Sequence, residues 1–112
     1  MKLEGLRVWH ETREVVREVI ALTPALHGIG MADQMRRAAV SIASNLAEGV
    51  GRSSDRELIR FLVIARGSCA ELGAQLAIAS DCGCLAVNAP LIDRVDHVRR
   101  MLSALIKRLE SG

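Results

Sequence analysis

The residues most able to do chemistry form two polar rows in the middle of the chain. The first row has spacings of 3, 4, 4 and 3 residues and consists of Gln34, Arg37, Ser41, Asn45 and Glu48. The second consists of Ser68, Glu71 and Gln75, beside the small residues Gly67, Ala70, Gly73, Ala74 and Ala77. Residues three or four apart lie on one face of an α-helix, so each row predicts a polar stripe along a helix.

The chemistry that these rows could support is general acid and base catalysis by Glu48 and Glu71. No nucleophile, oxyanion donor or metal-binding motif accompanies the two carboxylates in the sequence. We therefore expect no enzyme, and favour a structural reading of the rows.

In that structural reading the rows face each other across two helices. Arg37 would pair with Glu71, and Asn45 with Ser68 or Gln75, because buried polar groups need partners. Such a network would fix the register between the helices. Another interpretation stays open, in which part of the rows faces a neighbouring subunit and specifies an oligomer.

The thiols and imidazoles do not form a metal site in the sequence. An odd number of cysteines, Cys69, Cys82 and Cys84, suits a reducing compartment better than a disulfide framework. Cys82 and Cys84 flank Gly83, but two thiolates without a nearby histidine are half a site, so a helix end is favoured. The three histidines are scattered, at His10, His27 and His97. We expect no metal and no other cofactor.

Positive charge is concentrated in the middle and at the end of the chain, although the net charge is only +2. Residues 36–66 hold six arginines against three acids, and residues 91–112 hold five basic against three acidic groups. Repeated around an oligomer, such modest patches would attract nucleic acid. The candidate nucleic-acid-binding residues are Arg36, Arg52, Arg56, Arg60, Arg66, Arg99, Arg100, Lys107 and Arg108.

Gly49, Gly51 and Arg52 raise the possibility of a phosphate-binding glycine loop. Such loops open a helix, whereas these glycines follow an apolar stripe and no P-loop lysine comes after them. We expect the two glycines to end a helix instead.

Apolar spacing predicts four helices. The first ends at Pro24, the second begins after the Gly28-Ile29-Gly30 turn, the third runs from a capping box at Ser54 and Glu57 to Gly83, and the fourth starts near Asn88 and Pro90. The first two stripes are Val8, Thr12, Val15, Val19 and Leu22, widened by Trp9, Val16 and Ile20, and then Met31, Met35, Ala38, Ile42 and Leu46. The other two are Leu58, Phe61, Ala65, Cys69, Leu72, Leu76 and Ala79, and then Leu91, Val95, Val98, Leu102, Leu105 and Leu109.

These helices predict an all-α fold, an antiparallel up-down-up-down four-helix bundle in a single domain over residues 1–112. Val40, Val63 and Ile78 lie off the main stripes and would need a neighbour, so we expect an oligomer. No apolar run approaches the roughly 20 residues of a membrane span, and the first residues lack the apolar stretch of a signal peptide. We expect a cytoplasmic protein that does not act at a membrane.

The segment QMRRAAVSIASNLAEGVGR, from Gln34 to Arg52, resembles the signature of a bacterial family of four-helix-bundle proteins encoded in intervening sequences of large-subunit ribosomal RNA genes. LRVWHET at Leu6 to Thr12 and FLVIARGSCAEL at Phe61 to Leu72 extend the resemblance over nearly the whole chain. The chain departs from the family pattern at Ala25-Leu26-His27 and in its few aromatic residues.

That family is similar to the accessory variability proteins of diversity-generating retroelements, which form basic pentamers that bind a reverse transcriptase and nucleic acid. The resemblance implies a homopentamer that binds RNA, DNA or a ribonucleoprotein through surface arginines. The alternative it implies is a protein scaffold, such as an accessory subunit of a reverse transcriptase. It assigns a role in fold and assembly, not catalysis, to Gln34, Arg37, Ser41, Asn45, Glu48, Gly49, Gly51, Arg52, Gly67, Ser68 and Glu71.

Overall fold

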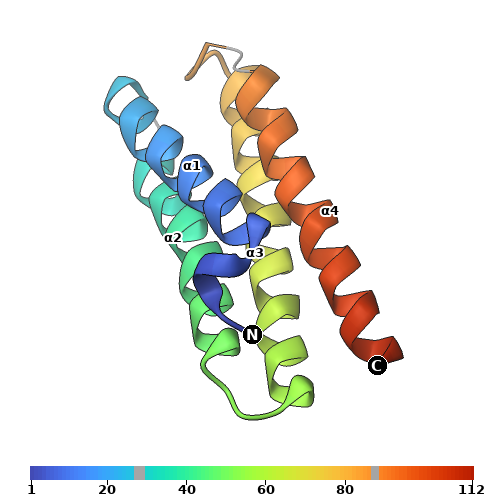
Figure 1. The fold of residues 1–112 in the computed structure, drawn as a ribbon. Coiled ribbons are helices and arrows are strands. Elements are labelled where there is room, and N and C mark those ends of the chain that lie inside the picture. The colour runs from blue at the N-terminus through green and yellow to red at the C-terminus, as the bar shows by residue number, and fades with distance from the viewer. Residues whose placement is uncertain (27–29, 87–88) are drawn as a thin grey trace.

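Four long helices make up the fold (Figure 1). The structure is a computed structural model and describes residues 1–26, 30–86 and 89–112. A 3-10 turn, η1 (Leu3–Gly5), leads into α1 (Arg7–Leu22), which a second turn, η2 (Thr23–Ala25), follows. The remaining helices are α2 (Met31–Val50), α3 (Asp55–Asp81) and α4 (Ala89–Ser111). The expected all-α four-helix bundle is confirmed, and it measures 45 × 20 × 19 Å.

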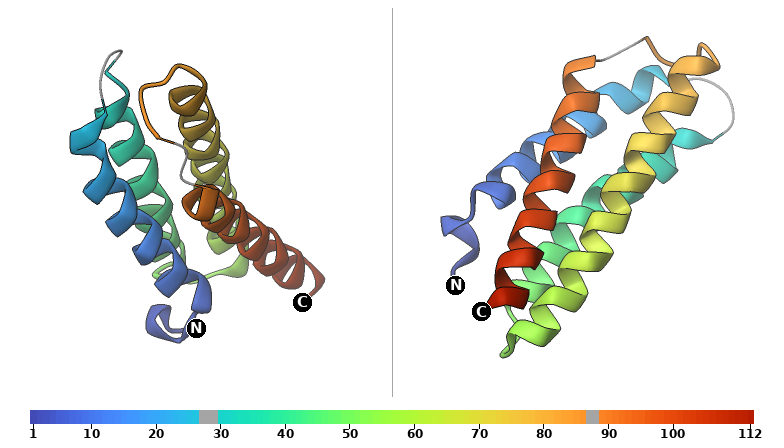
Figure 2. Two further views of the ribbon diagram at one scale, coloured as in Figure 1. Left: turned by 90° about the horizontal axis from the view of Figure 1, so that it is seen from above. Right: turned by 90° about the vertical axis from the view of Figure 1, so that its right-hand side faces the viewer.

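Successive helices run in opposite directions, so the bundle has two distinct ends (Figures 1 and 2). The turn between α2 and α3 and the end of α4 lie at one end, which we call the basic end for reasons given below. Helix α1 is shorter and begins near the middle of the bundle, with the N-terminal segment directed towards that end. The end of α1, the start of α2, the end of α3 and the start of α4 lie at the other.

Local sequence signals explain both ends of α3. The Ser54 hydroxyl accepts a hydrogen bond from the Glu57 backbone N–H at 3.2 Å, which is the first half of the expected capping box. The Glu57 carboxylate accepts instead from Arg60 Nε at 3.1 Å. At the other end Gly83 has φ +70°, and the Cys84 N–H donates to the Ala79 carbonyl at 2.9 Å. This is a Schellman ending, which a left-handed glycine makes possible.

The core is built from the predicted stripes. Every apolar residue expected on the second stripe is buried, and so are Leu91, Val95, Val98, Leu102 and Leu105 of α4. Ile20 was wrongly placed on the first stripe: it is 48% exposed, because it lies on the side of α1 opposite the α4 contact made by Glu18. Leu62 is fully buried, although the spacing had favoured Phe61, which is half-buried.

Gly49 has a different role from the one expected. It lies inside α2 and is buried, and a Cβ added there would come within 2.9 Å of Phe61 Cβ and 3.0 Å of Leu58 Cδ1. Gly51 follows the last residue of α2 with an ordinary helical φ of −76°. The helix ends where predicted, but Gly49 serves the close approach of α2 to α3 and neither glycine adopts a left-handed cap.

Several expectations fall outside the described residues. These are the cap at Asn88, His27 in the first loop, and Gly28 and Ile29 of the first turn. Pro90 does lie in the first turn of α4, as expected for a proline at a helix start.

One helix in the described part of the chain, α3, is long and apolar enough by length and composition to cross a membrane. Its most apolar window of 18 residues has a mean hydropathy of 1.3, and 33% of that window is buried within the bundle. The expectation that no apolar run reaches the length of a membrane span therefore does not hold for α3. The exposed part of α3 includes Val63, Ile64 and Ile78, which the core of one chain does not cover.

Candidate interaction surfaces

The two polar rows meet along the seam between α2 and α3. The Ser41 and Ser68 hydroxyls are 2.9 Å apart and share a hydrogen bond across the seam. Asn45 Nδ2 donates to the Ser41 carbonyl at 2.8 Å and lies 3.1 Å from its hydroxyl, while Ser68 donates to the Ile64 carbonyl at 3.3 Å. The rows therefore help to fix the register between the two helices, through one serine pair rather than through the expected partners.

The predicted pairs across the rows do not form. Asn45 bonds back to its own helix because Ser41, one turn earlier, is the residue opposite Ser68. Arg37 and Glu71 are both exposed, and Arg37 has no ion pair with any described residue. The structure thus places Arg37 and Glu71 outward, on the open side of the seam.

Gln75 stands apart because it is buried and incompletely bonded. It is 7% exposed, and its Nε2 donates to Glu71 Oε1 at 3.2 Å. Its Oε1 has no hydrogen-bond partner within the described residues. Gln34, the first member of the other row, is exposed and forms no hydrogen bond with Gln75 in the described structure, so the row of α3 is not closed by that of α2.

The outer face of α3 beside this seam is apolar and open. Val63, Ile64 and Ile78 are 42%, 43% and 47% exposed, respectively. Between them the helix presents the small exposed residues Gly67, Ala70, Ala74 and Ala77, and Glu71 is the only charged residue of that central face. We call these eight residues the α3 face. Val40 of α2 is also exposed, as expected, and lines a shallow hollow of about 380 Å³ on α2.

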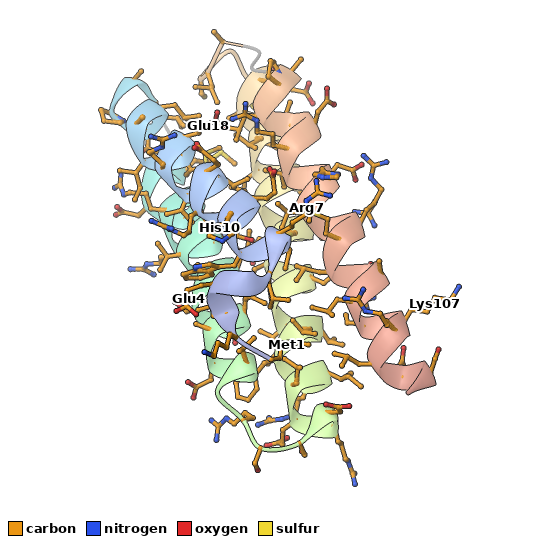
Figure 3. The ribbon with its side chains drawn as sticks, viewed as in Figure 1. Met1, Glu4, Arg7, His10, Glu18 and Lys107 are labelled. Carbon is orange, nitrogen blue, oxygen red and sulfur yellow. The ribbon has the colours of Figure 1, made fainter. Side chains whose placement is uncertain are left out.

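A hollow between α1 and α2 holds the titratable side chains His10, Glu11 and Glu14. It encloses about 590 Å³ and is lined by His10, Glu11 and Glu14 of α1 and by Ala43 of α2, among others. His10 Nε2 lies 2.8 Å from the Glu4 carbonyl (Figure 3). A hydrogen bond from Arg17 lowers the pKa of Glu14, so this carboxylate stays ionised and is a poor proton donor at neutral pH.

The other candidate groups for chemistry lie apart. Glu48 forms an ion pair with Arg52 at 2.8 Å, while Glu71 lies farther along α3 with Gln75 as its partner. Within the described residues, no three His, Cys, Asp or Glu side chains are placed to hold a metal ion. Burial raises the pKa of the Cys69 thiol to about 12, which leaves it an unreactive core residue.

Most of the nine predicted nucleic-acid-binding residues are engaged with carboxylates. Arg36 pairs with Asp33, Arg52 with Glu48 and Arg60 with Glu57, while Arg99 and Arg100 both pair with Asp96. The hydrogen bond from Arg99 lowers the pKa of Asp96 and keeps this partner charged. Arg66 lies 3.5 Å from the Ser103 hydroxyl. Arg56, Lys107 and Arg108 form no ion pair within the described part of the chain.

Three of these arginines gather at the turn between α2 and α3. Arg52 and Arg60 both contact the ring of Phe61, each with its guanidinium carbon 4.9 Å from the ring centre. Arg56 is exposed one turn before Arg60. The aromatic ring holds two guanidinium groups in place, so this turn presents an ordered cationic surface.

A comparison with protein families accounts for this combination of bundle and motifs. The family model described as 23S rRNA-intervening sequence protein matches residues 4–104. The chain belongs to this family. A search of curated proteins found no match. The segment from Gln34 to Arg52, which carries the resemblance in the sequence, lies wholly within the matched range. The sequence pattern places Arg7 on a solvated face of the first helix and not among the binding residues; in the structure it is the first residue of α1 and has no ion pair within the described residues.

Proposed function

We propose that this 23S rRNA-intervening sequence protein is a non-enzymatic, cytoplasmic, homo-oligomeric protein that binds RNA, DNA or a ribonucleoprotein. The observation that carries the proposal is the cluster of Arg52, Arg56 and Arg60 at the turn between α2 and α3, ordered by Phe61. Arg52 and Arg60 each pair with a carboxylate, Glu48 and Glu57 respectively, and keep further N–H groups that could bind phosphate. Arg56 has no ion pair within the described residues.

The oligomer in this proposal assembles through the α3 face. Val63, Ile64 and Ile78 would leave a row of apolar side chains in water if the chain stayed alone, whereas a second copy would cover them. The small residues between them permit close approach of another helix. A lipid bilayer is the weaker cover, because the exposed carboxylate of Glu71 lies in the middle of the α3 face. The homopentamer that the family resemblance implies is the assembly we propose.

Assembly would repeat the weakly basic surface of one chain several times in the oligomer. One chain has a net charge of only +2, which is small for a nucleic-acid-binding domain. In a pentamer each arginine cluster occurs in five copies, so several weak phosphate contacts act together on one strand. The proposal therefore links affinity to assembly.

Binding to a fluorescein-labelled RNA hairpin, titrated over a range of salt concentrations, tests the proposal. We expect the affinity to fall as salt rises, with a slope that reports the number of phosphates contacted. Light scattering on the same sample should give a mass well above the 12.1 kDa of one chain. Absence of binding by the assembled protein, or an affinity that does not change with salt, would refute the binding function.

A second candidate function rests on the apolar character of the α3 face. The same face could seat a different protein, such as a reverse transcriptase for which this chain would be an accessory subunit. A pulldown with a reverse transcriptase encoded near the gene distinguishes the two functions. A monomer that binds the enzyme tightly and RNA not at all would favour the scaffold.

A further inference from the structure

The up-down arrangement sorts the charged residues between the two ends of the bundle. Dividing each helix at its midpoint assigns residues 1–14, 41–68 and 100–112 to the basic end. These segments contain ten basic and seven acidic side chains, a net charge of +3. Residues 15–40 and 69–99 contain five basic and six acidic side chains, a net charge of −1. Positive charge is thus concentrated in one half of the bundle, although the net charge of the whole chain is small.

Within the basic end, the start of α1 and the end of α4 form a shallow groove. It has a volume of about 320 Å³, and its charged lining residues are Arg7 and Arg108. Leu6, Met101 and Ala104 are among the apolar residues that line it. Lys107 extends outward from α4 near the groove, and Arg7 lies at the start of α1 (Figure 3).

The two arginines of the groove are free to bind an anion. Neither Arg7 nor Arg108 forms an ion pair or hydrogen bond with any side chain in the described ranges. This sets them apart from Arg36, Arg52, Arg60, Arg99 and Arg100, each of which already has a carboxylate partner. A phosphate that binds to Arg7 and Arg108 does not have to displace an internal carboxylate, so the gain in binding is not offset by a broken pair.

We infer that the groove between the start of α1 and the end of α4 binds the phosphodiester backbone of a nucleic acid, with Arg7 and Arg108 as its phosphate ligands. This inference rests on the proposed function and adds a second contact surface to the arginine cluster at the turn between α2 and α3. Two guanidinium groups flanking an apolar lining match a nucleotide, whose phosphate is anionic and whose sugar and base have apolar faces.

An acidic peptide is the competing partner for two cations. It would make use of the positive charge but not of Leu6, Met101 and Ala104, which line the groove with apolar surface. Arg108 lies in the last turn of α4, where a cation stabilises the negative end of the helix dipole, and this role is compatible with binding. Arg7 lies in the first turn of α1, where a cation interacts unfavourably with the helix dipole. Arg7 thus lacks this structural explanation.

The test compares two double variants of equal charge. Arg7→Gln with Arg108→Gln removes both cations of the groove, and Arg17→Gln with Arg37→Gln removes two cations from the opposite end. The probe is the fluorescein-labelled RNA hairpin, measured at several salt concentrations. Circular dichroism and light scattering are run on each variant, so that affinities are compared only between proteins of equal helix content and mass.

We expect the groove variant to bind RNA about tenfold more weakly and with a salt slope lower by about 1 to 2 for each groove engaged. The control variant should stay within about twofold of the wild type. Equal losses in both variants would overturn the inference, because they would show that only total charge matters. So would unchanged binding by the groove variant, or competition by polyglutamate as effective as that by unlabelled RNA.

Failure of the proposed function looks different from failure of this inference. If the assembled wild-type protein does not bind the hairpin, both are refuted. If the wild type binds and the Arg7 and Arg108 variant binds equally well, only the groove is refuted. In that case a variant carrying Arg52→Gln and Arg56→Gln shows whether the turn between α2 and α3 provides the contact instead.

Discussion

At the scale of single residues, burial separates three cysteines that look alike in the sequence. Cys69 lies in the core, Cys82 is exposed and Cys84 is half-buried at the end of α3. Because burial raises the pKa of Cys69 to about 12, almost none of it is present as the reactive thiolate at neutral pH.

We predict that a thiol reagent at about pH 8 labels Cys82 and Cys84 and leaves Cys69 unlabelled until the protein unfolds. Mass spectrometry of the labelled protein measures this directly. The variant with Cys82→Ser and Cys84→Ser is the control and should take up label only in denaturant. Rapid labelling of that variant in buffer would show that Cys69 is not buried.

The arginines likewise differ from one another in whether a carboxylate binds them. The sequence treats Arg52, Arg60 and Arg108 as equivalent surface cations. In the structure the first two are held by carboxylates and by Phe61, whereas Arg108 has no such partner among residues 1–26, 30–86 and 89–112. Composition and local charge therefore overstate how much positive charge is free to meet a ligand.

At the scale of elements, the most extensive contact is between α2 and α3, and Gly49 permits their close approach. A methyl group at this position would meet Phe61 Cβ at 2.9 Å and the Leu58 carbonyl at 3.3 Å. The first partner is the stem of a side chain and the second is backbone, so neither can move away without shifting a helix.

We predict that Gly49→Ala lowers the free energy of unfolding by about 1 to 3 kcal/mol, although alanine is the better helix former. Gly73→Ala is the matched control, because its Cβ would have only Val95 nearby, at 4.0 Å. It should raise stability by about 0.5 to 1 kcal/mol. Urea unfolding followed by circular dichroism measures both, and an increase in stability for Gly49→Ala would contradict the packing argument.

At the scale of the whole molecule, the α3 face is the surface that a single chain leaves uncovered. We predict that Ile64→Ser with Ile78→Ser lowers the mass seen by light scattering towards 12.1 kDa, because it removes apolar area from the proposed interface. Helix content should not change, since both side chains point away from the core of their own chain.

Ile20→Ser is the control for that experiment. Ile20 is as exposed as Ile78 but lies on α1, away from the α3 face, so its replacement should leave the mass unchanged. An unaltered mass for the Ile64 and Ile78 variant would place the interface elsewhere. A wild-type mass of one chain would refute assembly altogether.

Charge polarity also belongs to the molecule as a whole. The positive segments at residues 36–66 and 91–112 are far apart in the sequence, but α3 begins and α4 ends at the same end of the bundle. Arg52, Arg56, Arg60, Lys107 and Arg108 therefore fall in the same half of the bundle as Arg7, whereas Arg36 and Arg99 fall in the other half. That end is where the proposed nucleic-acid contacts lie.

The sequence by itself determined the number of helices, most of their boundaries and most of the core. These depend on local information: the apolar period of a helix, the Ser54 cap and the left-handed glycine at Gly83 are all readable within a few residues. The family signature was also readable, because its motifs are contiguous.

Only the tertiary structure decided which residues meet between helices. Periodicity defines a face but not the register or distance at which two faces pack, so it could not foresee that Ser41 pairs with Ser68 or that Gly49 lies against Phe61. For the same reason it could not tell paired arginines from free ones, nor bring Arg7 beside Arg108 from opposite ends of the chain. Contacts between distant segments depend on how the helices are packed, and that packing is a property of the folded chain.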